Sequence, residues 1–251
     1  MKMSRDTIEW IEPDWPAPTN VRAFSTLRHG GVSKAPFDTL NLALHVGDIP
    51  ALVHKNRQLV KSVLCLPDEP CWMQQVHGIE VINAATYPVP PVADACITQE
   101  AKRVCAVMTA DCLPVLLCNR QGTCVAAAHA GWRGLAGGVL VKTVEALNCS
   151  STDLLAWLGP AIGCNTFEVG DEVRSVFVAR DAANAACFKR NQNQRWLADL
   201  YQLARNELGN LGVTDIFAEP ACTVTDASQF FSYRRDGQTG RMASMIWLQA
   251  G

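Results

Sequence analysis

Cysteine and histidine side chains stand at the ends of hydrophobic runs in the middle of the chain. Cys112 lies in the segment Thr109-Ala-Asp-Cys-Leu-Pro114, and His129 closes the next hydrophobic run. His77 stands at the end of an earlier one. Imidazole and thiolate are good zinc donors, and three protein ligands leave the fourth position of a catalytic zinc site open. His77, Cys112 and His129 are therefore either a metal site or ordinary buried residues.

The same thiol and imidazole support a second chemistry. Cys112 can act as a nucleophile while His129 takes its proton, as in Cys–His hydrolases. Asp94 and Asp111 stand among small or apolar residues, where a carboxylate is either bonded to the backbone or serves as a functional base. Metal binding and nucleophilic attack both need a thiolate beside a histidine, so the spacing leaves both open. Cys112, Asp94 and Asp111 are the candidate catalytic residues.

Arginines and glycines in predicted loops suggest contacts with an anion. Arg28 and Arg133 lie beside glycines, and a guanidinium can bind phosphate through two parallel hydrogen bonds. A surface charge is the alternative for each, and it is the stronger one for Arg234 and Arg235. The glycines after His129 lack the spacing of dinucleotide-binding or Walker loops. Close packing of a helix on a sheet is the expected role for most of them, namely Gly131, Gly134, Gly137 and Gly138.

The elements that must position these residues are mainly strands. Three hydrophobic runs predict strands at about 103–109, 113–118 and 123–129, and a further strand is predicted over 71–77. Helical spacing predicts helices over 49–65 and 135–147. Strands outnumber helices and the connections are mixed. The pattern favours an α/β (α+β) fold with a mixed β-sheet core flanked by helices, in a single domain spanning 1–251.

Composition excludes several classes of protein. The chain has 251 residues and a formal net charge of −2, which is unlike the basic footprint of a nucleic-acid binder. No apolar run reaches the length of a membrane span, and the first residues lack the apolar core of a signal peptide. The 11 cysteines are odd in number and form no CxxC pairs. Reduced thiols and a cytoplasmic location are expected, with no nucleic-acid or membrane partner.

Taken together, the motifs resemble the laccase-domain, or YfiH-like, family nearly from end to end. They stand in order along the chain as Phe24-Ser-Thr-Leu-Arg-His-Gly-Gly-Val-Ser33, Asn41-Leu, Val46-Gly-Asp48, Gln74-Gln-Val-His-Gly78, Ala93-Asp-Ala95, Thr109-Ala-Asp-Cys-Leu-Pro-Val115, Ala128-His-Ala-Gly-Trp-Arg-Gly134, Leu158-Gly-Pro-Ala-Ile-Gly163, Phe167-Glu-Val-Gly170 and Phe231-Ser-Tyr-Arg-Arg-Asp236. One departure is Leu27, which separates Thr26 from Arg28.

This resemblance implies a zinc-dependent purine nucleoside phosphorylase that acts on adenosine, inosine, guanosine and methylthioadenosine and also deaminates adenosine. It implies one zinc ion on His77, Cys112 and His129, and a fold related to the cysteine hydrolase toxins of the cytotoxic necrotizing type. Residue chemistry makes Arg28, Asn41 and Arg133 candidates for binding phosphate and ribose. Asp94 and Asp111 are candidates for base contact or proton transfer. The expected partners are a purine nucleoside and phosphate.

Other activities associated with the family remain as alternatives. The family is named for multicopper polyphenol oxidases, but five histidines in total are too few for several copper centres. Copper would nevertheless bind such nitrogen and sulfur ligands more tightly than zinc if it were offered. Some relatives are associated with peptidoglycan editing, which makes a cysteine-type amidohydrolase the second alternative. A binding protein with a purely structural zinc is the third, and it predicts loss of folding without metal.

Overall fold

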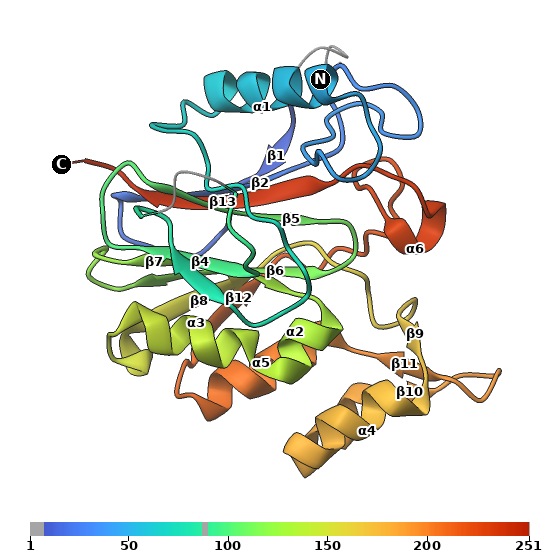
Figure 1. Cartoon of the computed structure of the whole chain (residues 1–251). Coiled ribbons are helices and arrows are strands. Elements are labelled where there is room, and N and C mark those ends of the chain that lie inside the picture. Colours follow the sequence, from blue (N-terminus) through green and yellow to red (C-terminus); the bar gives the residue numbers. More distant parts are fainter. Residues whose placement is uncertain (1–7, 87–89, 251) are drawn as a thin grey trace.

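The protein is described from a computed structural model, which covers residues 8–86 and 90–250. Two β-sheets pack face to face in its centre, and helices lie on both outer sides (Figure 1). One sheet has four strands in the order β1-β2-β13-β5, and the other has six in the order β12-β8-β6-β7-β4-β3. These four layers, with helices outside and a core that includes a mixed sheet, confirm the fold class predicted from the sequence.

All neighbouring strands in the four-stranded sheet are antiparallel. Its last strand in the sequence occupies an inner position, between β2 and β5, and so joins the beginning, the middle and the end of the chain. The strands are β1 (Trp10–Ile11), β2 (Val21–Thr26), β5 (Val104–Thr109) and β13 (Met242–Leu248).

The six-stranded sheet is mixed, because its two outer pairs, β12 with β8 and β3 with β4, are parallel while its inner pairs are antiparallel. Its strands are β3 (Val81–Asn83), β4 (Ala95–Thr98), β6 (Leu113–Asn119), β7 (Val125–Ala130), β8 (Leu154–Leu158) and β12 (Asp215–Ala218). The three strands predicted at about 103–109, 113–118 and 123–129 are confirmed as β5, β6 and β7.

A third, three-stranded sheet lies to one side together with α4 (Asp171–Arg180) (Figure 1). It consists of β9 (Glu168–Val169), β10 (Phe188–Arg190) and β11 (Trp196–Ala198). Asp199 immediately follows β11 and caps the next helix, α5 (Leu200–Asn210), by accepting a hydrogen bond from the backbone N–H of Gln202.

Alternation along the strands explains why their sequences are continuously hydrophobic. In β6, Leu113, Val115 and Leu117 belong to the core beneath the helices, whereas Leu116 and Cys118 belong to the core between the two sheets. Successive side chains of a strand point to opposite faces, and both faces of β6 are covered. The strand is therefore apolar from Leu113 to Cys118, and all seven of its residues, including the final Asn119, are buried.

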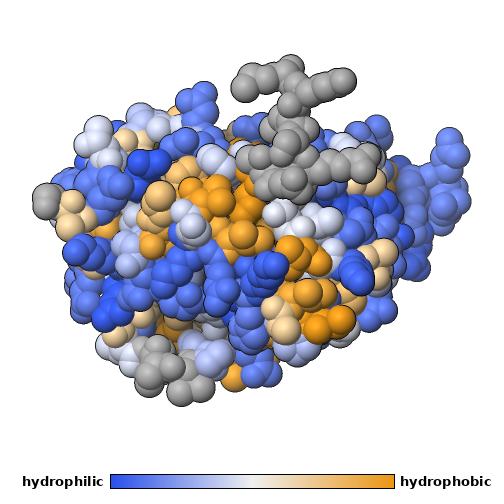
Figure 2. All heavy atoms as spheres, turned by 90° about the horizontal axis from the view of Figure 1, so that it is seen from above, coloured by the Kyte–Doolittle hydropathy of each residue, from blue (hydrophilic) through white to orange (hydrophobic). Residues whose placement is uncertain are grey.

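Helices cover the outer face of each sheet. Helix α1 (Pro50–Val63) lies over the four-stranded sheet and buries Val53, Asn56 and Val60. Helices α2 (Trp132–Gly137), α3 (Val139–Leu147) and α5 lie over the six-stranded sheet (Figure 1). The face seen from the α1 side shows separate hydrophobic patches among hydrophilic side chains (Figure 2). None of the helices in residues 8–86 and 90–250 has the length and hydrophobicity to span a membrane.

Two predictions of local structure are wrong. The helix predicted over 135–147 is divided at Gly138, whose φ of 96° lies in the left-handed region, so α2 ends there and α3 begins. The strand predicted over 71–77 is reduced to isolated bridges at Cys71 and Gln74. The side chain of Gln75 replaces a strand partner, since it donates to Met108 O at 2.8 Å and accepts from Met108 N at 2.7 Å.

Candidate metal centre and cleft

The pairing of β6 with β7 brings Cys112 and His129 to the same edge of the six-stranded sheet. His129 is the residue before the end of β7 and faces Pro114, the second residue of β6. Cys112 immediately precedes β6. Because the strands are antiparallel, the start of one lies beside the end of the other. The two side chains predicted to act together therefore come from adjoining positions on rigid strands.

His77 reaches the same place from a loop that is held by Asp94. The fully buried Asp94 carboxylate accepts hydrogen bonds from the backbone N–H groups of Val76 (3.1 Å), His77 (2.9 Å) and Gly78 (2.6 Å). The left-handed backbone of His77, with φ of 61°, is fixed in this way. Asp94 Oδ1 also lies 2.8 Å from His129 Nδ1. One carboxylate thus positions both histidines.

The three side chains form a compact group that can hold a metal ion. Their ligand atoms all lie within 4.8 Å of one another. Cys112 Sγ is 3.7 Å from His77 Nε2, and the two imidazole centroids are 4.8 Å apart. With Nδ1 of His129 facing Asp94, its Nε2 is left for a ligand, and such a carboxylate partner orients a metal-binding histidine. The group is the one predicted from the sequence.

Gly131 makes room for this group. A Cβ atom built there would lie 2.9 Å from both Cys112 Sγ and His77 Cδ2, which is too close for any larger residue. A Cβ on Gly134 would lie 2.9 Å from Gly78 O, so this glycine lets α2 approach the His77 loop. Close packing is therefore the role of both glycines, as predicted.

The electrostatics of the group favour a thiolate beside a histidine. Burial opposes ionisation of Cys112, but His129 and His77 outweigh it and lower the pKa of the thiol to about 6. Burial likewise disfavours a charged His129, yet the neighbouring Cys112 and Asp94 raise its pKa to about 9. The pKa of Asp94 is lowered despite its burial, chiefly because of His129 and the backbone N–H groups. Thiolate is the form that binds metal or attacks a substrate.

A cleft of about 400 Å³ opens beside the three ligands. Its wall combines aromatic rings with three arginines, and one of these is Arg133, a residue proposed from the sequence to bind the substrate. The lining includes Gln75, Met108, Ile162 and Leu200, the aromatic residues Trp132, Phe167 and Tyr233, and the polar or charged residues His45, Asp111, Arg133, Arg234 and Arg241. Such a wall suits a flat apolar molecule that either carries a negative charge itself or binds together with an anion.

Asp111 lies in the cleft wall, and protein groups engage both of its carboxylate oxygens. Oδ1 accepts from Thr223 Oγ1 at 2.5 Å, and Oδ2 accepts from the backbone N–H of Arg234 at 2.6 Å. Arg234 belongs to α6 (Tyr233–Asp236), which the hydroxyl of Ser232 caps. Asp111 therefore ties the loop before β6 to the segment that presents Tyr233 and Arg234.

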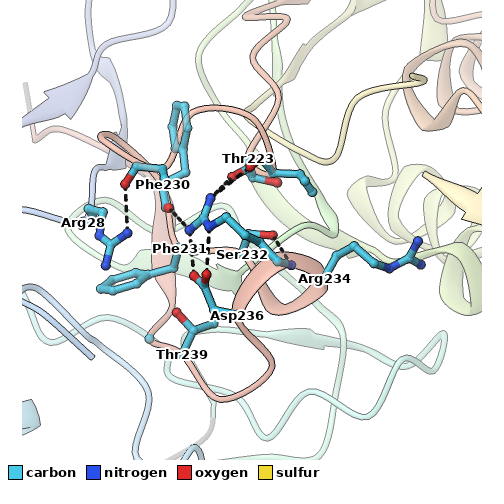
Figure 3. A network of polar contacts seen from close by, with 12 residues as sticks. Arg28, Thr223, Phe230, Phe231, Ser232, Arg234, Asp236 and Thr239 are labelled. Carbon is cyan, nitrogen blue, oxygen red and sulfur yellow. Dashed lines mark hydrogen bonds and ion pairs between the residues drawn. The ribbon is translucent and has the colours of Figure 1, made fainter. Parts of the chain in front are cut away.

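The segment around α6 is stabilised by Arg235. Its Nη1 donates to Thr223 O at 2.7 Å, its Nη2 donates to Phe230 O at 2.9 Å, and its side chain pairs with Asp236. Arg28 and Arg234 project from opposite sides of this network (Figure 3). Arg235 consequently holds the loop, while Arg234 reaches the cleft.

Two of the predicted substrate-binding residues lie outside the cleft lining. Arg28 is used on the neighbouring loops, where it donates to Asp38 O and Ala227 O and stacks on the ring of Phe231. Asn41 is fully buried and bonds Ala43, Asp48 and the backbone N–H of Arg241. Asp94 also stands behind His129 rather than in the lining. Asn41 and Asp94 therefore hold cleft residues in place, and Arg28 holds loops beyond the cleft lining.

Other cleft residues were not singled out from the sequence, namely His45, Gln75, Tyr233 and Arg241. The first three stand within or beside the motifs Asn41-Leu…Val46-Gly-Asp, Gln-Gln-Val-His-Gly and Phe-Ser-Tyr-Arg-Arg-Asp, and that placement was the available signal. Arg241 precedes the hydrophobic strand β13, and nothing in its local pattern distinguishes it from an ordinary charge at a strand end.

Comparison with known proteins identifies the family. A family model described as multi-copper polyphenol oxidoreductase laccase matches residues 22–249. The chain belongs to this family. The resemblance inferred from the motifs is thereby confirmed.

Similar proteins match over nearly the whole chain. The Escherichia coli protein named purine nucleoside phosphorylase YfiH is 53% identical over 95% of this chain and 98% of its own length. A Pseudomonas aeruginosa protein, also named purine nucleoside phosphorylase, is 52% identical over 96% of this chain and 98% of its own. A crystal structure of a Neisseria meningitidis protein has a TM-score of 0.93 and 48% identity, covering 96% and 99% of the two chains.

Proposed function

We propose that this protein is a zinc-dependent purine nucleoside phosphorylase that also deaminates adenosine. The observation that carries the proposal is the His77–Cys112–His129 group at the edge of a cleft whose wall is both aromatic and cationic. The names of the relatives from Escherichia coli and Pseudomonas aeruginosa support the same activity. Adenosine, inosine, guanosine and methylthioadenosine are the proposed substrates.

The donor set fits one zinc ion. Two imidazoles and one thiolate are borderline-soft ligands, and a three-residue set leaves a coordination position open for water or substrate. Copper binds such ligands more tightly, so metal content depends on supply as well as on the site. Bound zinc would supply a positive charge that polarises a substrate oxygen or lowers the pKa of water. Asp94 would keep His129 in the orientation and tautomer that this binding needs.

The cleft wall suits the other components of the reaction. Trp132, Phe167 and Tyr233 offer flat apolar surfaces for a purine, and the arginines attract an anionic co-substrate. In phosphorolysis a phosphate oxygen bonds to C1′ of the ribose while the bond from C1′ to the purine nitrogen breaks. The bonding electrons leave with the purine, which takes up a proton. Asp111, in the cleft wall, is the proposed group for base contact or proton transfer.

The direct test combines metal analysis with a phosphate-dependence assay. Protein purified without added metal should contain about one zinc per chain and release hypoxanthine from inosine only when orthophosphate is present. Cys112→Ala should lose both zinc and turnover. Zinc-free protein that is folded but inactive on every nucleoside, even after zinc is added, would falsify the proposal.

A cysteine amidohydrolase acting on a peptide-like cell-wall precursor is the second candidate. The geometry that favours it is the sequence of contacts from Cys112 to His129 to Asp94, which is the order of nucleophile, base and orienting carboxylate. This activity would survive removal of metal by a chelator and end when Cys112 is alkylated. Nucleoside phosphorolysis would end with either treatment.

A further inference from the structure

A second cavity adjoins the main cleft at Arg241. It has about 400 Å³ and is lined by Val46, Gly237, Gln238 and Thr239 together with three residues that also line the main cleft, His45, Tyr233 and Arg241. The three shared residues therefore stand where the two cavities meet. A ligand at this boundary can contact a molecule in the main cleft.

The guanidinium of Arg241 is anchored on one side and open on the other. Its Nη1 donates to the carbonyl oxygens of Thr239 and Gly240, both at 2.9 Å. Its Nε and Nη2 have no hydrogen-bond partner among residues 8–86 and 90–250. These two N–H groups form the edge of the guanidinium that binds two oxygens of a phosphate in parallel.

The backbone of Arg241 is also fixed. Its N–H donates to Asn41 Oδ1 at 3.0 Å, and Asn41 belongs to a buried network in which it also bonds Asp48 and Ala43. Arg234 is anchored in a similar way, because its backbone N–H donates to Asp111 Oδ2 and its Nη1 donates to Glu168 O, but its side chain is exposed. Arg133 is also exposed and stacks on Trp132. Arg241 is the half-buried arginine of the cleft, with a fixed position and an open binding edge.

The charges around this boundary favour an anion. Burial lowers the pKa of His45, and the positive charges of Arg241 and Arg57 lower it further, which indicates a local excess of positive charge. Asp111 is the carboxylate that lines the main cleft, and protein donors already engage both of its oxygens. A doubly charged phosphate would compensate the cationic groups and receive hydrogen bonds from them.

Resting on the phosphorolysis proposed above, we propose that Arg241 and His45 form the orthophosphate subsite and hold the oxygen that bonds to C1′ of the nucleoside. Arg241 binds two phosphate oxygens through Nε and Nη2, and His45 donates to a third. This assignment differs from the sequence-based one, in which Arg28 and Asn41 contact the substrate directly. Asn41 now acts through Arg241, whose backbone it positions.

Two measurements on zinc-loaded protein test the subsite, namely calorimetric titration with inorganic phosphate and initial rates of inosine phosphorolysis at varied phosphate. Arg241→Gln should weaken phosphate binding and raise the KM for phosphate by about 10- to 100-fold, because it removes a charge-assisted pair of hydrogen bonds. Its KM for inosine and its zinc content should be nearly unchanged. Arg241→Lys should restore part of the affinity, and His45→Gln should weaken it less than Arg241→Gln.

Arg120→Gln is the matched control, because Arg120 pairs with Asp215 just beyond the opposite end of β6 from Cys112. Unchanged phosphate binding in folded Arg241→Gln would overturn the subsite. So would loss of binding to adenosine 5′-monophosphate with intact binding of orthophosphate, since the cavity would then serve a substrate's own phosphate. A third outcome separates the two proposals. If the wild-type protein binds phosphate without catalysing phosphorolysis, and Arg241→Gln abolishes that binding, the subsite is supported and the proposed function fails.

Discussion

The two ends of the cleft are built in different ways. The metal-binding end takes Cys112 and His129 from paired strands and fixes His77 through a single buried carboxylate. The cationic end takes His45 from the loop before α1, Tyr233 from the start of α6 and Arg241 from the position just before β13. Rigid strands give the precision that metal coordination needs. Loops at the other end leave room for ligands of different sizes.

The difference predicts that substitutions at the two ends separate metal binding from anion binding. Changes at the strand end should remove zinc and with it all turnover. Changes at the loop end should leave zinc in place and alter the dependence on phosphate. The predictions that follow run from the largest expected effect to the smallest.

Cys112→Ala should produce the largest loss. Removing one of three ligands should reduce zinc affinity by more than the roughly 10- to 100-fold that is typical for losing a residue behind the ligands. Metal content by elemental analysis and inosine phosphorolysis measure the effect. Cys105→Ala is the control, because Cys105 is a thiol buried between the two sheets. Full zinc content in Cys112→Ala would remove this thiol from the ligand set.

Asp94→Asn should weaken the strand end without removing a ligand. The amide keeps the size of the side chain but places an NH₂ group against backbone donors of the His77 loop. We expect zinc affinity to fall by about 10- to 100-fold and the free energy of unfolding by about 1–3 kcal/mol. Competition with a chromogenic chelator and urea unfolding measure the two. If zinc affinity stays unchanged, Asp94 does not orient the ligands.

Asn41→Ala should affect the loop end alone. It leaves the backbone N–H groups of Ala43 and Arg241 without their acceptor, at a cost of about 1–3 kcal/mol of stability for each. Phosphate affinity should fall because Arg241 loses its anchor, while zinc content should stay at the wild-type value. Gln58→Ala, on the exposed side of α1, is the control. A loss of zinc in Asn41→Ala would show that the two ends are coupled.

Removal of the metal should have the smallest effect on the fold. Hydrogen bonds within the protein form the strands and the Asp94 contacts that hold the ligands. We expect chelated protein to keep its circular dichroism spectrum and unfold cooperatively, with a melting temperature lower by about 10 °C at most. Unfolding on chelation would instead favour a structural zinc.

The sequence predicted the strand end well because its signals are local. Cys112, His129 and the strands that deliver them lie within a short stretch, and hydrophobic runs mark the strands clearly. Antiparallel pairing of β6 with β7 across their short connection then brings the start of β6 beside the end of β7. His77 lies beside Cys112 and His129, although its expected strand is a loop, because the motif identified the residue independently of its local structure.

The loop end was harder to predict because its contacts are not local. Asn41 and Arg28 have side chains that often bind substrates. In this protein, however, both side chains form hydrogen bonds within the protein, and Arg28 also stacks on an aromatic ring. Arg241 has the local pattern of an ordinary charged strand end, and its hydrogen bonds to Asn41, Thr239 and Gly240 form only in the folded protein. Sequence patterns report residue chemistry but not which donors remain free after folding.

The inner position of β13 has a consequence for how the protein is made. Residues 242–248 pair with both β2 and β5, so the four-stranded sheet cannot close until this late segment has emerged from the ribosome. Pairings between such distant segments form slowly. Until then, the edges of β2 and β5 that face β13 lack a pairing partner and are open to association with other chains. We expect the yield of folded protein to depend on protection of that incomplete sheet during synthesis. This dependence should be greater than the stability of the folded protein alone would predict.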